Sequence, residues 1–310
     1  MTITQLEYVL AVATHRNFTL ASEKCFVTQP TLSMQIQKLE DELDIQIFDR
    51  SKKPIKVTKI GESIVEQART VINESKRISD IVDSEKGKIS GDFKIGIIPT
   101  IIPTLLPLFL KTFMKRYPEV KITVEELQTH QIVQQLKDGL IDVGIAATPL
   151  EESSIFEKPI YYEPFVAFLP DNHRLSNKKR LSSNDLELTE MLLLEDGHCF
   201  RNNIINLCKS DQELHLSKLN LETGSFDALV QLTKDGFGYT LLPYLHTKRM
   251  KLEDEKNLKE FEKPFPAREV SIVYGKSQLK LQIIEALNKT ITSIIKGVIL
   301  TEDTQIVSPL

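Results

Sequence analysis

The pattern of apolar positions predicts three short helices within the first 45 residues. The first and third helices repeat apolar residues three or four positions apart, as one buried helix face requires. A second short helix, TLASEKCF, lies between them, and VTQP ends it before Pro30 opens the third helix, PTLSMQIQKLEDEL. The apolar positions are Leu6, Val9, Leu10 and Ala13 in the first helix, and Leu32, Ile36, Leu39 and Leu43 in the third.

The opposite face of the third helix carries polar side chains of the types that contact base edges and phosphates. A short helix, a tight turn and a second helix with a polar outer face form a helix-turn-helix. The segment IQIFDRSKKPIKVTKIG then predicts two strands joined by a basic turn, which is a wing whose cations lie along phosphates. We expect DNA contacts from Thr28, Gln29, Pro30, Thr31, Ser33, Gln35, Lys38, Arg50, Lys52 and Lys53.

These sixty residues resemble the N-terminal domain of LysR-type transcriptional regulators. The stretch FTLASEKCFVTQPTLSMQIQKLEDEL, followed by IFDR and VTKIGE, matches the pattern of that family nearly throughout. The departures are Ser22, where alanine is usual, Met34 at a frequently polar site, and Asp44 in place of glycine. The resemblance implies a winged helix-turn-helix domain at residues 1–60 that binds double-stranded promoter DNA, in a protein that contacts RNA polymerase.

Residues 61–86 predict a linker helix, since they contain neither proline nor glycine after Gly61. Its apolar side chains form one stripe, and a lone helix with such a stripe must bury it against something. The resemblance implies that this helix pairs subunits into a dimer, and we expect further assembly into a homotetramer; the alternative is a core helix of the same domain. The stripe consists of Ile64, Ala68, Val71, Ile72, Ile78 and Ile81.

Strand-like and helical segments alternate after a glycine-containing hinge at residues 87–91. Such alternation predicts α/β sheets with helical crossovers. The expected strands cover residues 93–98, 121–127, 141–146, 165–169, 191–194, 239–242 and 269–274. The expected helices cover residues 104–116, 130–139, 201–208, 225–235 and 278–296.

The family resemblance implies that this second part folds like a periplasmic binding protein, with two subdomains and a cleft between them. The chain would cross near Pro164 and return near Arg268. We therefore expect an α+β winged helix-turn-helix DNA-binding domain plus an α/β periplasmic-binding-protein-like regulatory domain. Its subdomain I would comprise residues 92–164 and 268–300, and its subdomain II residues 165–267, with a redox segment at 196–210.

Composition and charge agree with a DNA-binding protein of several domains. A chain of 310 residues usually forms more than one core. Of its 39 basic and 43 acidic residues, residues 1–88 hold 13 of each, so the basic wing belongs to an otherwise acidic protein. The longest uncharged run, residues 95–110, contains three prolines and is too short to span a bilayer. We expect a cytoplasmic protein without a membrane segment.

Two of the three cysteines, Cys199 and Cys208, lie nine residues apart in LLLEDGHCFRNNIINLCKS. A predicted strand-to-helix junction places Cys199 at a helix N-terminus, where free N–H groups favour the thiolate, the reactive form of a cysteine. His198 and Arg201 add hydrogen-bond donors or positive charge beside it. If the segment is helical, the two Cα atoms are about 13 Å apart, and a disulfide requires about 7 Å or less. A disulfide would therefore force local refolding, which suits a switch.

The same stretch resembles the OxyR subgroup of the LysR family, which senses hydrogen peroxide. The likeness extends to IGIIPT, QTHQ and TLLP and runs along nearly the whole chain. It implies that Cys199 is the peroxide-reacting thiol and that Cys208 closes a disulfide, which a cytosolic thiol reductant resets. We expect no cofactor. The resemblance implies a peroxide pocket of Thr100, Thr129, Gly197, His198 and Arg201, with Arg268 as a cation that stabilises the thiolate.

Other interpretations of these residues stay open. Cys199 or Cys208 can be a buried residue that only packs in the core, which is what we expect of Cys25. Thr100 and Thr129 can be helix caps, and Arg268 can be a solvated arginine before an edge strand.

Competing functions also remain. Two cysteines and one histidine lack the fourth ligand of a zinc site, so we expect no metal. His198 is adjacent to Cys199, which rarely gives a cysteine hydrolase its geometry, so we expect no enzyme. The alternatives are a LysR-type regulator that responds to a small anionic metabolite in the cleft, and a binding protein without a DNA function.

Overall fold

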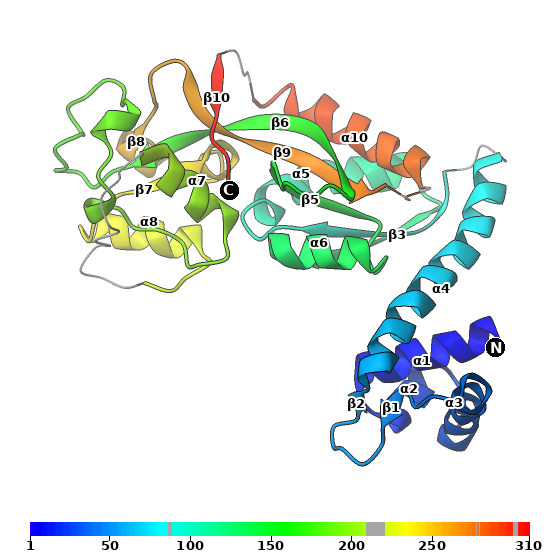
Figure 1. Ribbon diagram of the computed structural model, residues 1–310. Helices are drawn as coiled ribbons and strands as arrows, with labels where there is room; N and C mark the ends of the chain where they lie inside the picture. Colours follow the sequence, from blue (N-terminus) through cyan, green and yellow to red (C-terminus); the bar gives the residue numbers. More distant parts are fainter. Residues whose placement is uncertain (86–88, 209–220, 277, 279, 300–302) are drawn as a thin grey trace. The chain divides into compact units, whose positions relative to one another are not determined.

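The structure, a computed structural model, describes residues 1–85, 89–208, 221–276, 278, 280–299 and 303–310. The chain divides into two compact units, Met1–Lys88 and Ile89–Leu310 (Figure 1). Parts of the predicted segments lie outside the described residues: 86–88 of the linker and hinge, 209–220 of subdomain II with the end of the redox segment, and 277, 279 and 300 of subdomain I. Within the described ranges, no helix is long and apolar enough to cross a membrane.

The first unit has the helices and the wing that the apolar pattern predicted. Thr2, Asn17 and Thr28 accept hydrogen bonds from backbone N–H groups in the first turns of the three helices, which sets where each helix begins. The wing strands pair in antiparallel fashion. The elements are α1 (Ile3–His15), α2 (Phe18–Lys24), α3 (Gln29–Leu43), β1 (Phe48–Asp49), β2 (Lys56–Val57) and α4 (Lys59–Glu85).

The apolar stripe of α4 is divided between two environments. Ala68 and Ile72 are buried in the core of the first unit. Ile78 and Ile81, further along the helix, are 66% and 54% exposed. The exposed end of α4 is therefore available for a partner.

In α3, Leu43 was expected in the core but is 36% exposed, because it lies in the last turn of the helix, just before the left-handed residue that ends it.

A buried carboxylate joins the wing to α3. Glu40 is 3% exposed, and its Oε1 accepts the backbone N–H groups of Ile47 at 2.8 Å and Phe48 at 3.1 Å. Its Oε2 accepts a hydrogen bond from Arg50 Nη2 at 2.7 Å. Because a buried carboxylate is stable only when its oxygens are paired, Glu40 determines how the chain turns from α3 into β1.

A mixed sheet forms the frame of the second unit, with the strand order β4-β3-β5-β9-β6-β7. The pairs β3–β4 and β3–β5 are parallel, whereas β9 is antiparallel to both β5 and β6. The strands are β3 (Gly91–Ile97), β4 (Val120–Glu126), β5 (Val143–Thr148), β6 (Ile155–Phe168), β7 (Thr240–Pro243), β8 (Leu258–Lys259), β9 (Phe265–Gly275) and β10 (Thr304–Ile306).

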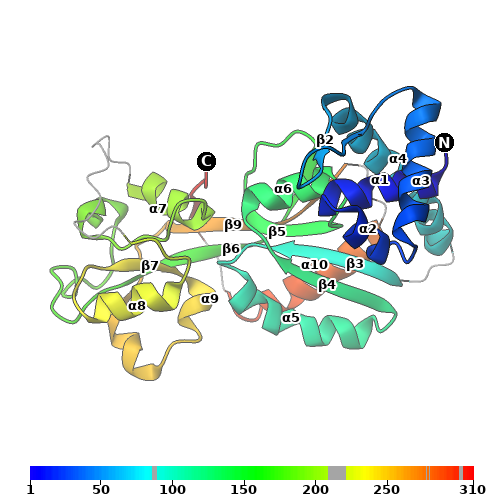
Figure 2. The ribbon, with the colours of Figure 1, turned by 90° about the horizontal axis from the view of Figure 1, so that it is seen from below.

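Helices cover this sheet (Figure 2) and enclose two hydrophobic clusters. The long strand β6 contributes to both clusters, whereas β9 contributes to the first. The first cluster includes Phe93, Phe109 and Ile272, and the second includes Phe165 and Phe200. The helices are α5 (Ile102–Arg116), α6 (Thr129–Lys137), α7 (Cys199–Cys208), α8 (Phe226–Lys234), α9 (Tyr244–Thr247) and α10 (Leu281–Ile295). The expected combination of a helix-turn-helix unit with a mixed α/β unit is confirmed.

One strand prediction was wrong and another was too short. The strand expected at residues 191–194 is a single parallel bridge between Met191 and Tyr239. The Thr240 hydroxyl donates to the Leu192 carbonyl at 2.9 Å, so a side chain replaces the next ladder bond. The strand expected at residues 165–169 is the end of the much longer β6, whose earlier part was hidden by prolines and by a register shift near Pro159.

Removing the Glu40 carboxylate should destabilise the first unit. Glu40→Ala leaves two buried backbone donors without a partner, and we expect the free energy of unfolding to fall by about 2–4 kcal/mol. Chemical denaturation followed by circular dichroism measures this change. Glu42→Ala is the matched control, because the Glu42 carboxylate is exposed and pairs with the N-terminal amine; it should stay within about 0.5 kcal/mol. Equal losses in the two variants would show that Glu40 does not hold the wing.

Candidate redox site

The two cysteines of the predicted switch lie at opposite ends of one short helix. Cys199 is the first residue of α7 and Cys208 is the last. Cys199 packs against the first hydrophobic cluster and Cys208 against the second. Both are free thiols, and the helical rise separates their Cα atoms by about 13 Å. The helix predicted between them is confirmed, and no disulfide spans this distance.

Two opposing influences act on the ionisation of the Cys199 thiol: burial disfavours the thiolate, and nearby charged and polar groups favour it. Burial raises the pKa of Cys199, and the Arg268 guanidinium is the largest influence that lowers it. The Thr129 hydroxyl and the backbone of Ala147 and Phe200 lower it further. Burial prevails, so the thiol is protonated at neutral pH, but the thiolate has a cation and three polar groups beside it.

Arg268 is fully buried, which contradicts the alternative of a solvated arginine before an edge strand. The reason is topological, because β9 lies between β5 and β6. Its Nη1 donates to Thr100 Oγ1 at 2.9 Å, and its Nη2 donates to the Thr100 carbonyl at 3.3 Å. The guanidinium also stacks over the Phe200 ring at 5.1 Å, so it contacts the residue that follows Cys199 in α7.

Glu163 is a residue of this site that the sequence analysis missed. Its side chain is fully buried, and Oε2 accepts hydrogen bonds from Arg268 Nε at 3.0 Å and Nη2 at 2.7 Å. Oε1 accepts the backbone N–H of Leu245 at 2.9 Å. The only sequence signal was a carboxylate inside the apolar run YYEPFVAFL. Strand register makes Glu163 and Arg268 direct partners, 105 positions apart.

The two threonines of the predicted pocket have different hydrogen-bonding states. Thr100 is buried and accepts from Arg268. Thr129 is the first residue of α6, and its buried Oγ1 has no hydrogen-bond partner among the described residues, although it lies close enough to lower the pKa of Cys199. Neither is a helix cap, since Ile101 precedes α5 and Gln128 precedes α6.

The remaining pocket residues shape the loop that enters α7. Gly197 has a φ of 90°, a conformation that favours glycine. His198 is buried with its Nε2 3.5 Å from Glu195 Oε1. Arg201 forms an ion pair with Asp196 at 2.8 Å and donates to the Leu194 carbonyl at 3.1 Å. The guanidinium of Arg201 thus braces this loop, and Arg268 is the cation with the largest effect on the thiol.

The C-terminal residues are attached to α7 between the two cysteines (Figure 1). Buried Asn203 donates its amide to the Val307 carbonyl at 2.6 Å. Asn206 donates to the carbonyls of Ser308 at 3.0 Å and Leu310 at 2.7 Å. The Asn203 Oδ1 is buried and has no partner within the described ranges, which offsets part of this stabilisation.

The predicted DNA-contacting residues fall into an exposed group and an anchored group that also forms bonds within the unit. The exposed group is Gln29, Pro30, Lys38, Lys52 and Lys53. In the anchored group, Thr28 caps α3 and bonds to the Thr31 hydroxyl, Ser33 accepts from Arg50 at 3.2 Å, and Gln35 accepts from Gln5 at 3.3 Å. Arg50 pairs with Glu40 and lies over the Phe18 ring. The anchored group therefore fixes the helix and wing that present the exposed group.

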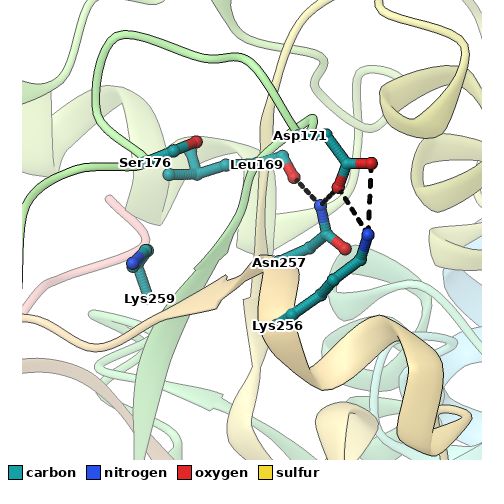
Figure 3. A pocket seen from close by; sticks show the side chains of 6 residues that line it. All are labelled: Leu169, Asp171, Ser176, Lys256, Asn257 and Lys259. Carbon is teal, nitrogen blue, oxygen red and sulfur yellow. Dashed lines mark hydrogen bonds and ion pairs between the residues drawn. The ribbon is translucent and has the colours of Figure 1, made fainter.

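A separate surface pocket of about 290 Å³ contains none of the predicted site residues (Figure 3). Asp171 pairs there with Asn257 and Lys256, and Lys259 lies on the opposite side. In the part of the chain that the structure describes, no group of three or more His, Cys, Asp or Glu side chains is placed to hold a metal ion.

Comparisons with known proteins place this site in context. Residues 3–62 match the bacterial regulatory helix-turn-helix protein, lysR family, and residues 86–292 match the LysR substrate binding domain. The hydrogen peroxide-inducible genes activator of Dickeya chrysanthemi is 36% identical over 277 residues, which cover 88% of this chain and 89% of that protein. The DNA-binding transcriptional dual regulator OxyR of Escherichia coli K12 is 35% identical, with the same coverage of 88% and 89%.

Solved structures give the same picture. A full-length OxyR variant from Pseudomonas aeruginosa, with aspartate in place of a cysteine, has a TM-score of 0.78 at 31% identity and covers 94% of this chain and 98% of its own. A hydrogen peroxide-bound cysteine variant of Corynebacterium glutamicum OxyR has a TM-score of 0.65 at 26% identity and covers 98% of both chains.

Loss of the Asn203 amide should loosen α7. In Asn203→Ala the Val307 carbonyl loses its donor, and we expect the opening free energy of α7 to fall by about 1–3 kcal/mol. Amide hydrogen exchange of residues 200–207 in the reduced protein measures this change. Asn202→Ala is the control on the same helix, because Asn202 is exposed. Unchanged protection in Asn203→Ala would mean that the Asn203–Val307 hydrogen bond does not stabilise the helix.

Proposed function

The chain belongs to the LysR family of bacterial transcriptional regulators, and on this premise we propose that it senses peroxide through a Cys199–Cys208 disulfide that alters its action on promoter DNA. Its relatives are regulators of transcription and not enzymes. One observation carries the proposal: Cys199 lies beside a buried cation and an unpaired buried hydroxyl, and Cys208 ends the same short helix.

The first step is attack of the Cys199 thiolate on one peroxide oxygen. The S–O bond forms, the O–O bond breaks, and the departing hydroxide takes a proton and leaves as water. Arg268 stabilises the thiolate, which is the nucleophilic form. The unpaired Thr129 hydroxyl and the Thr100 hydroxyl supply hydrogen bonds to the polar ligand, because a buried hydroxyl without a partner gains free energy on finding one. The product is a sulfenic acid on Cys199.

The second step is attack of Cys208 on the Cys199 sulfur. The S–S bond forms, the S–O bond of the sulfenic acid breaks, and the hydroxide leaves as water with the proton of the Cys208 thiol. Burial raises the pKa of Cys208 to about 11, so its thiol is a poor nucleophile while it packs against the second cluster. Cys208 must leave that cluster, and α7 must open, before the sulfurs can meet. Oxidation thus exchanges the packing of α7 for a covalent bond, and a local refolding follows.

The output is a change in DNA binding by an assembled protein. The exposed end of α4 provides a surface for pairing subunits into a dimer, and further assembly into a tetramer fits the same family plan. The wing and α3 then contact promoter DNA, and the regulator contacts RNA polymerase. We propose that it acts in the cytoplasm, where a thiol reductant returns the disulfide to two thiols.

Brief stoichiometric peroxide should remove two hydrogens from the reduced protein. We expect intact-protein mass and peptide mapping to show a Cys199–Cys208 cross-link, with Cys25 still free. Cys199→Ser should abolish both the cross-link and the promoter response, whereas Cys25→Ser is the control and should preserve them. Normal peroxide-driven regulation in Cys199→Ser would contradict the mechanism.

The wing should contribute phosphate contacts without sequence preference. Lys52→Ala is expected to weaken binding to promoter and unrelated duplexes alike, and to reduce the slope of log K against log salt by about 0.9. Fluorescence anisotropy at several salt concentrations measures both quantities. Lys111→Ala, an exposed lysine of α5, serves as the control. An unchanged slope in Lys52→Ala would show that the wing does not contact the phosphates through Lys52.

A further inference from the structure

We propose that Glu163 is a positioning residue for the reaction of Cys199: it holds Arg268 beside the thiol and, through Arg268, directs the Thr100 hydroxyl to act as a hydrogen-bond donor. This inference rests on the proposed function, because it concerns the same thiol. It assigns a role to a buried carboxylate that acts on the reacting sulfur through the side chain of Arg268.

The carboxylate is itself held in a single orientation. Its Oε2 takes two hydrogen bonds from the side of the Arg268 guanidinium, and its Oε1 takes the Leu245 N–H at the start of α9. Both side chains of the pair are fully buried. A guanidinium without solvent is tolerated only when it is paired and hydrogen-bonded, so Arg268 remains at this place because Glu163 is charged and fixed.

The orientation of Arg268 determines the direction of the next hydrogen bond. Its Nη1 donates to Thr100 Oγ1 at 2.9 Å, so that oxygen is an acceptor from the arginine. The Thr100 proton must therefore point elsewhere, and the hydroxyl is left to donate to another atom. When the peroxide O–O bond breaks, the leaving oxygen acquires negative charge, and a preset donor stabilises it.

Loss of Glu163 should act on the thiol through the displacement of Arg268. Without the carboxylate, the Arg268 Nε and one Nη2 hydrogen lose their acceptor, and the guanidinium keeps only its contacts with Thr100 and Phe200. An unpaired buried cation moves toward water or draws water in. The thiolate then loses the cation that has the largest stabilising effect on it.

A double-mutant cycle on one thiol tests this inference. In a Cys25→Ser/Cys208→Ser background, only Cys199 reacts with iodoacetamide, and mass spectrometry gives its alkylation rate as a function of pH. We expect Glu163→Gln and Arg268→Gln each to lower the rate at pH 7 by about tenfold and to move the pH profile upward. The double variant should match Arg268→Gln alone, because Glu163 acts through Arg268.

Two outcomes would overturn the inference. One is an unchanged profile in a folded Glu163→Gln protein. The other is a difference between Arg268→Gln and the double variant, which would show that Glu163 affects the thiol without the arginine. This second comparison decides the matter even if Glu163→Gln alone does not fold. The double variant has no buried charge, and the carboxylate left alone in Arg268→Gln is neutralised by taking up a proton.

The readout also separates this inference from the proposed function. Alkylation does not involve peroxide, so the cycle reports on Glu163 whether or not Cys199 is a peroxide sensor. If Cys199 of the unsubstituted protein does not react with stoichiometric peroxide, the proposed function fails and the positioning of Arg268 can still stand.

Discussion

A charge in the interior of a protein must be neutralised where it stands, and much of the second unit depends on one such pair. Arg268 and Glu163 face each other across the adjacent strands β9 and β6, and β6 contributes to both hydrophobic clusters. The arginine then reaches the start of α5 through Thr100 and the start of α7 through Phe200. Because the pair has no access to water, the segments around it are fixed relative to one another, and Cys199 lies among them.

The helix between the two cysteines is stabilised by contacts that the proposed disulfide would disrupt. Cys199 and Cys208 pack against different clusters, and two asparagines between them bind the C-terminal residues. As long as α7 is intact, its length keeps the sulfurs apart. The buried and unpaired Asn203 oxygen weakens the same helix. A segment that is well packed yet carries an unsatisfied polar atom suits a transition between two arrangements.

The first unit also depends on a buried charge that is paired. Glu40 accepts hydrogen bonds from two backbone donors and from Arg50, and in this way it holds the wing against α3. The exposed cations of the wing are then free to meet phosphates. The far end of α4 keeps its apolar side chains in solvent, so the fold of one chain leaves this stripe incomplete. A second copy of the chain would complete it, as expected of a regulator that binds DNA as an assembly.

Local chemistry determined what the sequence alone could predict. Helix periodicity, capping residues and the wing depend on neighbours within a few positions, so the helix-turn-helix and the helical Cys199–Cys208 segment followed from the chain itself. Contacts between distant segments decided the rest. The burial of Arg268 depends on strand order, and its pairing with Glu163 depends on the β6–β9 register. The hydrogen bond between Asn203 and Val307 joins residues 104 positions apart. No local pattern encodes such partners, because only the folded sheet brings them within hydrogen-bonding distance.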